Sequence, residues 1–366
     1  MALRYRLDRK IRALVMWAAS WMTPASREEP VVLRRQDTKR ILLVRGLFRM
    51  GDSILATPAV LLFRKNFPQA RIDFVGPRIS KVLFENLPID HHYEVYRSFP
   101  KVCWSYLVLI KKIRETQYDL AVDVSGSSAA LGSFIVGFSG ARLRVGVRGK
   151  WDRWFNGRLP RPAVKNKYGN LPELIGSMGL RTKHCYPRLI LTAREREEGE
   201  RRIQAAVGRG AQPVVGIFVG GRESRGKRWP QERICEVAAA LRAEGAKTVI
   251  FIGPEERELT GYFQEVLKQR SAIVFEPDPR TFAAMVANCD LFVGSDSGPM
   301  HLACALRVRT VVIFLNDNFD RWGPPAELGL IVHGKDGVPA DAVLQACRAE
   351  LANIATANSG SWAVNA

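Results

Sequence analysis

The sequence of 366 residues has few cysteines, no long apolar run and a shortage of acidic residues. Its six cysteines are scattered without a CxxC pair, which argues against a disulfide framework or a zinc site and favours reduced thiols in the cytoplasm. No stretch approaches the roughly 18 apolar residues of a membrane-spanning helix. Lys and Arg number 55 against 36 Asp and Glu, a formal net charge of +19. An anionic partner is therefore expected: nucleic acid, a membrane surface or a phosphorylated substrate.

The positive charge is concentrated in two segments. Residues 1–40 hold ten Lys or Arg and four Asp or Glu, and residues 142–167 hold nine Lys or Arg and a single acid. In residues 1–22 the apolar positions recur at helical spacing beside basic residues and two tryptophans, which predicts an amphipathic helix in a membrane interface. Packing of this helix on the protein's own core is the alternative. Clustered charge without a nucleic-acid-binding motif disfavours a nucleic-acid partner.

From residue 40 onward, apolar strands and helical patterns alternate, which predicts parallel sheets with helices on both faces. The chain is long enough for two such domains. The predicted parts are a basic amphipathic helix and linker (1–39), an N-terminal Rossmann-like domain (40–185), a C-terminal Rossmann-like domain (186–355) and a disordered tail (356–366). Two doubly wound α/β domains facing one another are expected to bind ligands at the carboxyl ends of their strands, in the cleft between them.

The first strand-to-helix turn carries a candidate catalytic acid. The strand predicted over 41–45 is followed by Gly51 and Asp52, and 52–67 is predicted as one helix that tolerates Pro58 at a local cost. One glycine beside an acid does not match the GxGxxG dinucleotide motif. Asp52 either caps the helix or acts as a general base, a carboxylate at a strand end that accepts a proton from an attacking hydroxyl.

Two turns in the second half offer polar groups after predicted strands. Gly220 and Gly221 follow the first of these strands and let the backbone approach a ligand, and Lys227 in the next loop can neutralise a leaving diphosphate. An ordinary surface lysine of a basic protein is the alternative for Lys227. Glu255 follows another strand, where it can accept a hydrogen bond from a ribose hydroxyl or cap the next helix.

The segment VGSDSGPMHLACAL, residues 293–306, runs from an apolar strand into an apolar helix through a polar turn. Ser297 or Gly298 suits the N-cap, and Pro299 suits the first helical turn because it lacks an N–H that would have no helical partner. The remaining N–H groups at such a helix end carry partial positive charge and form a seat for an anion such as phosphate. A well-capped helix without a ligand is the alternative.

Four separated segments resemble glycosyltransferase family 9, the heptosyltransferases of lipopolysaccharide core assembly. They occur in the family's order and spacing between about residues 40 and 325: ILLVRGLFRMGDSILATPAVLLFRKNFPQARIDFVG, GGRESRGKRWPQE, VGSDSGPMHLACALRVRTVVIF and RWGPP. The resemblance implies a two-domain GT-B architecture and an inverting, metal-independent transfer from ADP-heptose, without a cofactor. No DxD-type metal pair stands out, in agreement with it.

The resemblance also implies roles for individual residues. Asp52 matches the family's general base, and the domain that carries it becomes the acceptor-binding domain. The C-terminal domain becomes the nucleotide-sugar-binding domain, in which Lys227 contacts phosphate, the turn after residue 295 holds the diphosphate and Glu255 falls near the nucleoside contact. The expected donor-binding residues are Gly220, Gly221, Lys227, Glu255, Asp296, Ser297, Gly298, Met300 and His301.

A lipopolysaccharide precursor is a phosphorylated glycolipid in the inner leaflet, so an enzyme acting on it is expected at the cytoplasmic face of the inner membrane as a peripheral protein. The basic segment 142–167, with its aromatics Trp151, Trp154 and Phe155, is therefore assigned to the phosphorylated acceptor and the adjoining membrane face. The expected acceptor-binding residues are Gly51, Arg148, Lys150 and Arg153.

The sequence departs from the family pattern in two places. Lys165, Asn166 and Lys167 stand where a histidine or an acid is usual, and Leu315 and Asn316 replace the first two residues of a Gly-Pro-Thr-Asp-Pro run. These departures leave the sugar and the base open. A related transferase that uses another nucleotide sugar for O-antigen or capsule is the first alternative. An inactive scaffolding homologue and a nucleic-acid-binding protein are the others.

Overall fold

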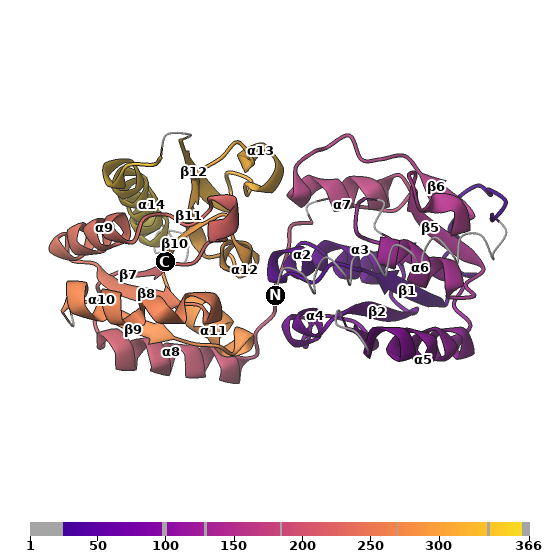
Figure 1. The fold of residues 1–366 in the computed structure, drawn as a ribbon, viewed down its shortest axis with the longest axis horizontal. Coiled ribbons are helices and arrows are strands. Elements are labelled where there is room, and N and C mark those ends of the chain that lie inside the picture. Colours follow the sequence, from indigo (N-terminus) through magenta and orange to yellow (C-terminus); the bar gives the residue numbers. More distant parts are fainter. Residues whose placement is uncertain are drawn as a thin grey trace. The chain divides into compact units, whose positions relative to one another are not determined.

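The computed structural model describes residues 25–96, 101–127, 130–183, 185–268, 270–334 and 337–360. The chain divides into two compact units, Met1–Tyr186 and Pro187–Ala366. Each unit is built on a six-stranded parallel sheet, as Figure 1 shows. The predicted α/β class with two parallel sheets is confirmed.

The sheet of the first unit has the strand order β3-β2-β1-β4-β5-β6. Its strands are β1 (Arg40–Val44), β2 (Arg71–Pro77), β3 (His91–Val95), β4 (Leu120–Asp123), β5 (Leu143–Val147) and β6 (Gly157–Leu159). Its helices are α2 (Met50–Ile54), α3 (Thr57–Asn66), α4 (Arg78–Leu83), α5 (Lys101–Thr116), α6 (Ala130–Phe138) and α7 (Lys167–Gly176), with a 3-10 turn η1 (Asp152–Trp154).

The sheet of the second unit has the order β12-β11-β10-β7-β8-β9. Its strands are β7 (Val214–Phe218), β8 (Lys247–Ile252), β9 (Ala272–Phe275), β10 (Leu291–Ser295), β11 (Arg309–Phe314) and β12 (Gly329–His333). Its helices are α8 (Ala193–Val207), α9 (Gln231–Ala243), α10 (Thr260–Leu267), α11 (Pro279–Val286), α12 (Gly298–Ala305), α13 (Phe319–Trp322) and α14 (Ala340–Gly360), with 3-10 turns η2 (Glu223–Arg225) and η3 (Pro254–Leu259).

The two sheets share one topology. In each, the first and fourth strands lie side by side: β1 beside β4 in the first sheet, and β7 beside β10 in the second. The connections that follow these two strands therefore lead toward opposite edges of the sheet. Open α/β sheets bind ligands outside the carboxyl ends of the strands at such a switch point. The topology therefore marks one place in each unit where functional side chains are expected.

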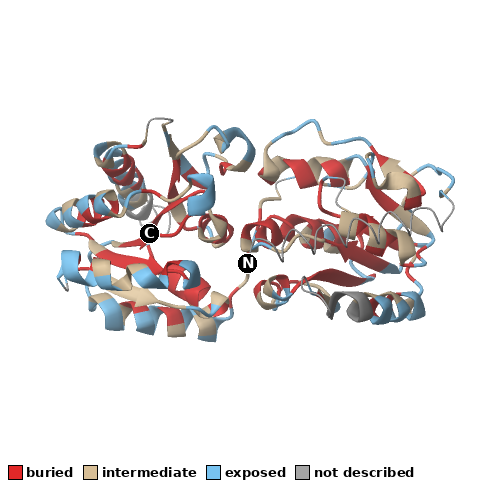
Figure 2. Ribbon diagram, in the orientation of Figure 1, coloured by how far each residue is buried: buried red, intermediate tan, exposed pale blue. Residues whose placement is uncertain are grey.

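The central strands are buried on both sides, which is why they appear in the sequence as continuous apolar runs. Ile41, Leu42, Leu43 and Val44 of β1 have no exposed surface, and the central strands of both sheets are red in Figure 2. Removing a Val, Leu or Ile side chain from water contributes about 1.5–3 kcal/mol. The sheets are thus rigid supports for the turns at their carboxyl ends.

Three stretches differ from the sequence-based predictions. The single helix predicted over 52–67 is wrong: α2 ends at Ile54 and α3 starts at Thr57, because Pro58 lacks an N–H and fits only the first turn of a new helix. Helix α14 continues to Gly360, into the predicted disordered tail. The basic segment 142–167 contains two strands, β5 and β6, that its charge concealed.

Candidate active site

In the second unit, the carboxyl ends of β7 and β10 bring a lysine and an aspartate together. The two strands pair along Val215–Phe218 and Leu291–Gly294. The segments that leave them carry Lys227 and Asp296, whose side chains form a short ion pair and are 14% and 8% exposed. Because an unpaired buried charge is costly, this contact holds the Lys227 ammonium at the switch point.

Helix α12 begins next to Asp296. Its N-cap is Ser297, and Pro299 lies in its first turn, which confirms the predicted helix start. The Ser297 hydroxyl caps no N–H of the helix, and its Oγ is buried without a hydrogen-bond partner in the described part of the chain. A helix N-terminus with a nearby ammonium and a hydroxyl still able to donate is suited to an anion.

His301 lies one turn into α12 and is 3% exposed. Burial, and then the charge of Lys227, lower its pKa to about 3, so the imidazole is neutral near pH 7. Its ring centroid lies 6.1 Å from that of Trp322 in α13. A neutral imidazole adds hydrogen-bonding capacity but no positive charge, so attraction of an anion depends on Lys227 and the helix end.

The loop after β7 packs so tightly that Gly221 leaves no room for a side chain. A Cβ there would lie 2.4 Å from the carbonyl oxygen of Lys227. Gly226 adopts a left-handed conformation (φ 59°) and lets the loop turn back, with the N–H of Lys227 donating to Arg222 O at 3.2 Å. The loop backbone therefore sets the position of Lys227.

A buried glutamate that was not among the expected donor-binding residues lies against this loop. Glu256 is 4% exposed, and a Cβ on Gly220 would lie 2.8 Å from its Oε1. Burial raises the pKa of Glu256, while Arg228, 3.9 Å away, opposes that rise. Glu255 is exposed. Of the two adjacent glutamates it is therefore Glu256 that lies against the glycine turn; the nucleoside contact of Glu255 stays a prediction.

In the first unit, Asp52 lies in α2 with its side chain 12% exposed. Its Oδ1 is 3.5 Å from Nη2 of Arg45, which follows β1 directly. Arg45 is buried and donates from Nη1 to the carbonyl oxygen of Val124 at 2.8 Å. The N-cap of α2 is Arg49, not Asp52. The carboxylate is thus held by an arginine that is itself anchored to the sheet.

A second buried acid ends the neighbouring strand β4. Asp123 pairs with Val44 in register and accepts the Ser125 N–H at 3.0 Å. Burial raises its pKa to about 6, against the opposing effects of Ser125 and Arg45. Sequence reasoning missed Arg45 and Asp123. The sequence pattern that could have identified both is a charged residue at the carboxyl end of an apolar strand. The two strands concerned, β1 and β4, flank the switch point.

The basic segment 142–167 is partly structural. Trp154 and Phe155 are 3% and 1% exposed, so the prediction that these two aromatics face a membrane is wrong: they pack inside the first unit. Arg148 is exposed and pairs with Glu28, and Lys150 Nζ lies 5.1 Å from the ring centroid of Trp151. Arg153 is half-buried, and Gly51 is buried in α2. Their acceptor contacts stay predictions.

The segment predicted as a linker is attached to this basic segment. The N–H of Ser26 donates to Arg153 O at 2.8 Å, and the N–H of Glu29 donates to Asn156 O at 2.7 Å. The helix predicted for residues 1–22 lies outside the described residues. Ser26 and Glu29 thus attach the start of the described chain to the basic segment.

The described part of the chain holds neither a cluster of metal-binding side chains nor a membrane-spanning helix. No group of three or more His, Cys, Asp and Glu side chains in the described ranges is placed to hold a metal ion. None of the helices in these ranges is long and apolar enough to span a bilayer. The five cysteines that the structure describes are free thiols: Cys185, Cys235, Cys289, Cys304 and Cys347.

Comparison with known proteins agrees with this architecture. The family model described as glycosyltransferase family 9 (heptosyltransferase) matches residues 106–339. Lipopolysaccharide heptosyltransferase 3 of Escherichia coli is 26% identical over 293 residues, which are 75% of this chain and 83% of the relative.

Two solved structures share the fold. A glycosyl transferase family 9 protein from Veillonella parvula matches with a TM-score of 0.74 and 21% identity, over 87% of this chain and 99% of its own. The E. coli ADP-heptose LPS heptosyltransferase II matches with a TM-score of 0.69 and 20% identity, over 85% and 98%. The chain therefore belongs to glycosyltransferase family 9, the heptosyltransferase family, and is a glycosyltransferase with the GT-B fold.

Proposed function

We propose that the protein is an inverting, metal-independent transferase that moves a heptose from ADP-heptose to a lipopolysaccharide core acceptor. The observation that carries the proposal is the Lys227–Asp296 ion pair beside the N-terminus of α12, a site suited to a diphosphate. The family and a relative that uses ADP-heptose support the choice of donor. The C-terminal unit then binds the donor, and the N-terminal unit binds the acceptor.

In this mechanism Asp52 acts as the general base. Its carboxylate takes the proton of an acceptor hydroxyl, whose oxygen attacks the anomeric carbon of the heptose from the face opposite the diphosphate. The bond from that carbon to the phosphate oxygen breaks, and ADP leaves with the electron pair. Inversion follows because a single displacement reverses the anomeric configuration.

The negative charge that develops on the leaving ADP is stabilised in the second unit. Lys227 and the backbone N–H groups at the start of α12, beginning with Gly298, face this charge, and the Ser297 hydroxyl donates a further hydrogen bond. Donors that are already in place stabilise a transition state because little reorganisation is needed. Asp296 keeps the ammonium group in position.

The acceptor is a phosphorylated glycolipid of the inner membrane, and the basic N-terminal unit associates with its anionic surface as a peripheral protein on the cytoplasmic face. Arg148 and Lys150 contact the acceptor phosphates in this proposal. The first unit suits that role because it carries the whole excess of charge: residues 187–366 contain 22 Lys or Arg and 22 Asp or Glu.

The test is turnover of a lipopolysaccharide precursor with a panel of donors, read by mass spectrometry of the product. We expect a mass increase of one heptose with ADP-heptose and none with UDP- or GDP-sugars. Preference for one of the other donors would instead support a transferase for O-antigen or capsule. Undiminished turnover in the presence of a chelator is expected for a metal-independent reaction.

A further inference from the structure

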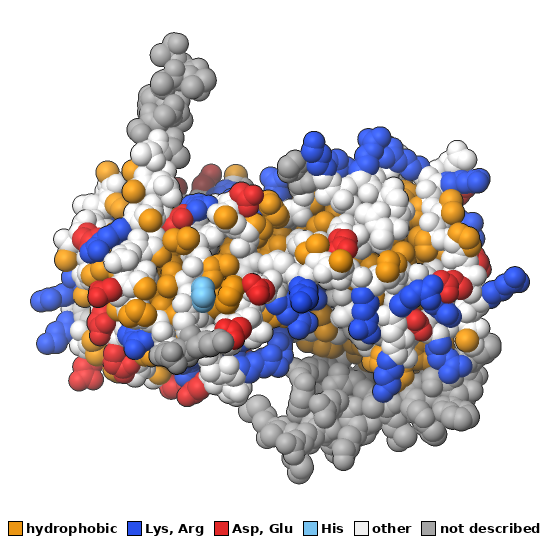
Figure 3. All heavy atoms as spheres, turned by 90° about the horizontal axis from the view of Figure 1, so that it is seen from above, with side chains coloured by type: hydrophobic (Ala, Val, Ile, Leu, Met, Phe, Trp, Pro, Cys, Tyr) orange, Lys and Arg blue, Asp and Glu red, His pale blue; other side chains and the backbone are white. Residues whose placement is uncertain are grey.

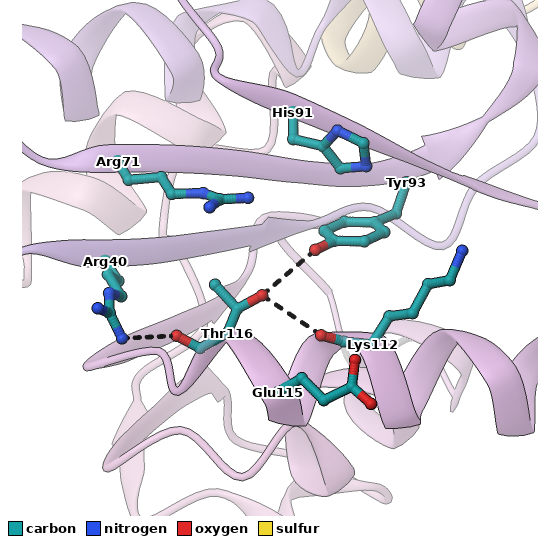
Figure 4. Close-up of a pocket in the computed structure, with 7 residues that line it drawn as sticks. All are labelled: Arg40, Arg71, His91, Tyr93, Lys112, Glu115 and Thr116. Atoms are coloured by element: carbon teal, nitrogen blue, oxygen red, sulfur yellow. Dashed lines mark hydrogen bonds between the residues drawn. The ribbon is translucent and has the colours of Figure 1, made fainter.

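A basic pocket lies at the opposite edge of the first sheet from Asp52. It occupies about 490 Å³, and Figure 4 shows the residues that line it: Arg40, Arg71, His91, Tyr93, Lys112, Glu115 and Thr116. Arg40, Arg71 and His91 are the first residues of β1, β2 and β3. Arg45 and Asp123 follow or end strands at the carboxyl edge. The five residues of β1 separate the two edges by about 15 Å, at about 3.3 Å per residue.

Two guanidinium groups in the pocket are held in place, that of Arg71 by strand β2 and that of Arg40 by the end of α5. Nε of Arg71 donates to both carboxylate oxygens of Asp73, at 3.1 and 3.0 Å, and Asp73 has no exposed surface. The Tyr118 hydroxyl donates to the same carboxylate. Nη1 of Arg40 donates to the carbonyl oxygen of Thr116 at 2.9 Å. Because both groups are already oriented, little conformational entropy is lost when they bind a ligand.

The charges in the pocket do not cancel. Arg71 is balanced by Asp73 beneath it, whereas neither Arg40 nor Lys112 forms an ion pair with a described carboxylate, and Glu115 is the single acid of the lining. Phosphate groups are bound in proteins by such combinations of guanidinium and ammonium groups. The pocket therefore keeps a net positive charge and favours an anion such as a phosphate group.

The remaining wall has the composition of a carbohydrate site. The rings of His91 and Tyr93 meet edge to face with centroids 4.4 Å apart, and the Tyr93 hydroxyl lies 3.5 Å from Oγ1 of Thr116. In Figure 4 the Glu115 carboxylate, from α5, and the Tyr93 ring, from β3, lie on the same side of the pocket as Lys112. An aromatic face, a hydroxyl and a carboxylate can pack on a sugar ring and accept its hydroxyl protons.

We propose that this pocket binds a phosphorylated sugar at a site separate from both switch points. The phosphate lies against Arg40 and Arg71, and the sugar hydroxyls face Lys112, Glu115 and Tyr93. The same group is found on a soluble sugar phosphate and on a phosphorylated glycolipid, so the two sources must be tested separately. The proposal is independent of the transferase reaction and of its donor.

Binding is tested on the full chain with glucose 1-phosphate as the probe, by calorimetry and by NMR of histidine-labelled protein. The sequence has five histidines, and His91 reports on this pocket while His301 reports on the donor site. We expect the His91 signal, assigned with His91→Gln, to shift while His301 does not. Glucose should cause no shift, and binding should weaken with added salt because exposed charges are screened.

Lys112→Ala and Arg40→Gln should each weaken glucose 1-phosphate binding about tenfold, the size expected when one charge-assisted hydrogen bond is lost. Lys111→Ala is the matched control, because Lys111 is an exposed neighbour on α5 outside the lining. Equal losses in Lys111→Ala and Lys112→Ala, a shift of His301 without His91, or no binding at millimolar probe would overturn the proposal.

Vesicles of phosphatidylcholine with and without diphosphoryl lipid A distinguish the two sources. If the ligand is a glycolipid, cosedimentation with lipid A vesicles should fall in Lys112→Ala and stay unchanged in Lys111→Ala. If it is a soluble sugar phosphate, both variants should cosediment equally while glucose 1-phosphate binding still depends on Lys112. Transfer activity does not enter either measurement, so failure of this proposal leaves the proposed reaction untouched.

Discussion

At the residue scale, both candidate sites consist of a charged side chain held by a buried partner. Arg45 holds Asp52, and Asp296 holds Lys227. A charge that is paired at low exposure stays in one position, which general-base catalysis and phosphate binding both require. The partners matter as much as the residues that touch substrate.

Replacing Asp52 by Asn should lower kcat by about 100-fold or more, because general-base catalysis contributes roughly 10²–10⁴. ADP binding, measured by calorimetry, should hardly change. Asp37→Asn removes an exposed carboxylate of the same unit and serves as the control. Near-normal turnover of the Asp52 variant would remove this residue from the mechanism.

Lys227→Ala should weaken ADP binding and leave adenosine binding much less affected, since adenosine has no phosphate. This substitution also leaves Asp296 buried without its partner, which repels phosphate and destabilises the fold. The double variant Lys227→Ala, Asp296→Asn removes that carboxylate charge and isolates the loss of the ammonium group. Equal losses for ADP and adenosine would contradict the assignment.

The pKa of Asp123, raised by burial to about 6 from an ordinary value of 3.8, predicts a pH effect on stability. The folded chain binds this proton more tightly than the unfolded chain, so the group's contribution to stability is present at low pH and falls between about pH 4 and 6. Asn does not titrate, so the free energy of unfolding of Asp123→Asn should lack this fall. Relative to the native chain, the variant should therefore become more stable by up to about 3 kcal/mol between pH 4 and 7, at about 1.4 kcal/mol per pKa unit. Urea unfolding at both pH values measures this, and a pH-independent difference would refute it.

At the scale of single elements, the turns that leave β1, β4, β7 and β10 decide what each unit can do. The strands are apolar and similar, and the turns differ: the first unit presents acids with an arginine, and the second a lysine loop and a helix end. The conformation of the loop after β7 depends on Gly221, because the backbone of Lys227 occupies the space that a Cβ at this position would need.

Gly221→Ala should displace the loop and weaken ADP binding by about tenfold or more, as expected if a charge-assisted hydrogen bond is lost. Gly261→Ala in α10 is the matched control: nothing lies within 4 Å of its Cβ position. Ala at that helical position should leave ADP binding unchanged and stabilise the chain by about 0.5–1 kcal/mol. Unchanged ADP affinity in Gly221→Ala would show that the loop does not position Lys227.

At the scale of the whole molecule, charge is divided between the two units. The second unit is neutral by sequence, so the first carries the whole formal +19. On the face shown in Figure 3, Lys and Arg side chains are numerous over the first unit, with few acids among them. A field of one sign attracts anionic partners over long distances. The donor unit depends instead on local groups to hold phosphate.

Deleting residues 1–22 should release the protein from anionic liposomes at physiological salt, since each basic residue near such a surface contributes about 1 kcal/mol. The contacts of Ser26 and Glu29 with the basic segment remain, so turnover on a soluble, deacylated acceptor should persist. Flotation of the truncated chain with liposomes would show that residues 1–22 are not the membrane-binding element.

Lys150→Glu should raise KM for the phosphorylated acceptor and leave ADP affinity alone.

The sequence alone determined the α/β class, most strands and helices, and the start of α12, because these depend on local apolar spacing and on cap residues such as Ser297 and Pro299. Only the tertiary structure decided which charges meet. Arg45 and Asp123 are far apart in sequence and come together because β1 and β4 are neighbours. Likewise, only packing shows that Trp154 and Phe155 are core residues within a basic segment, and that Glu256 lies against Gly220 while Glu255 faces solvent. Strand order and burial are set by contacts between distant segments, and local sequence does not encode them.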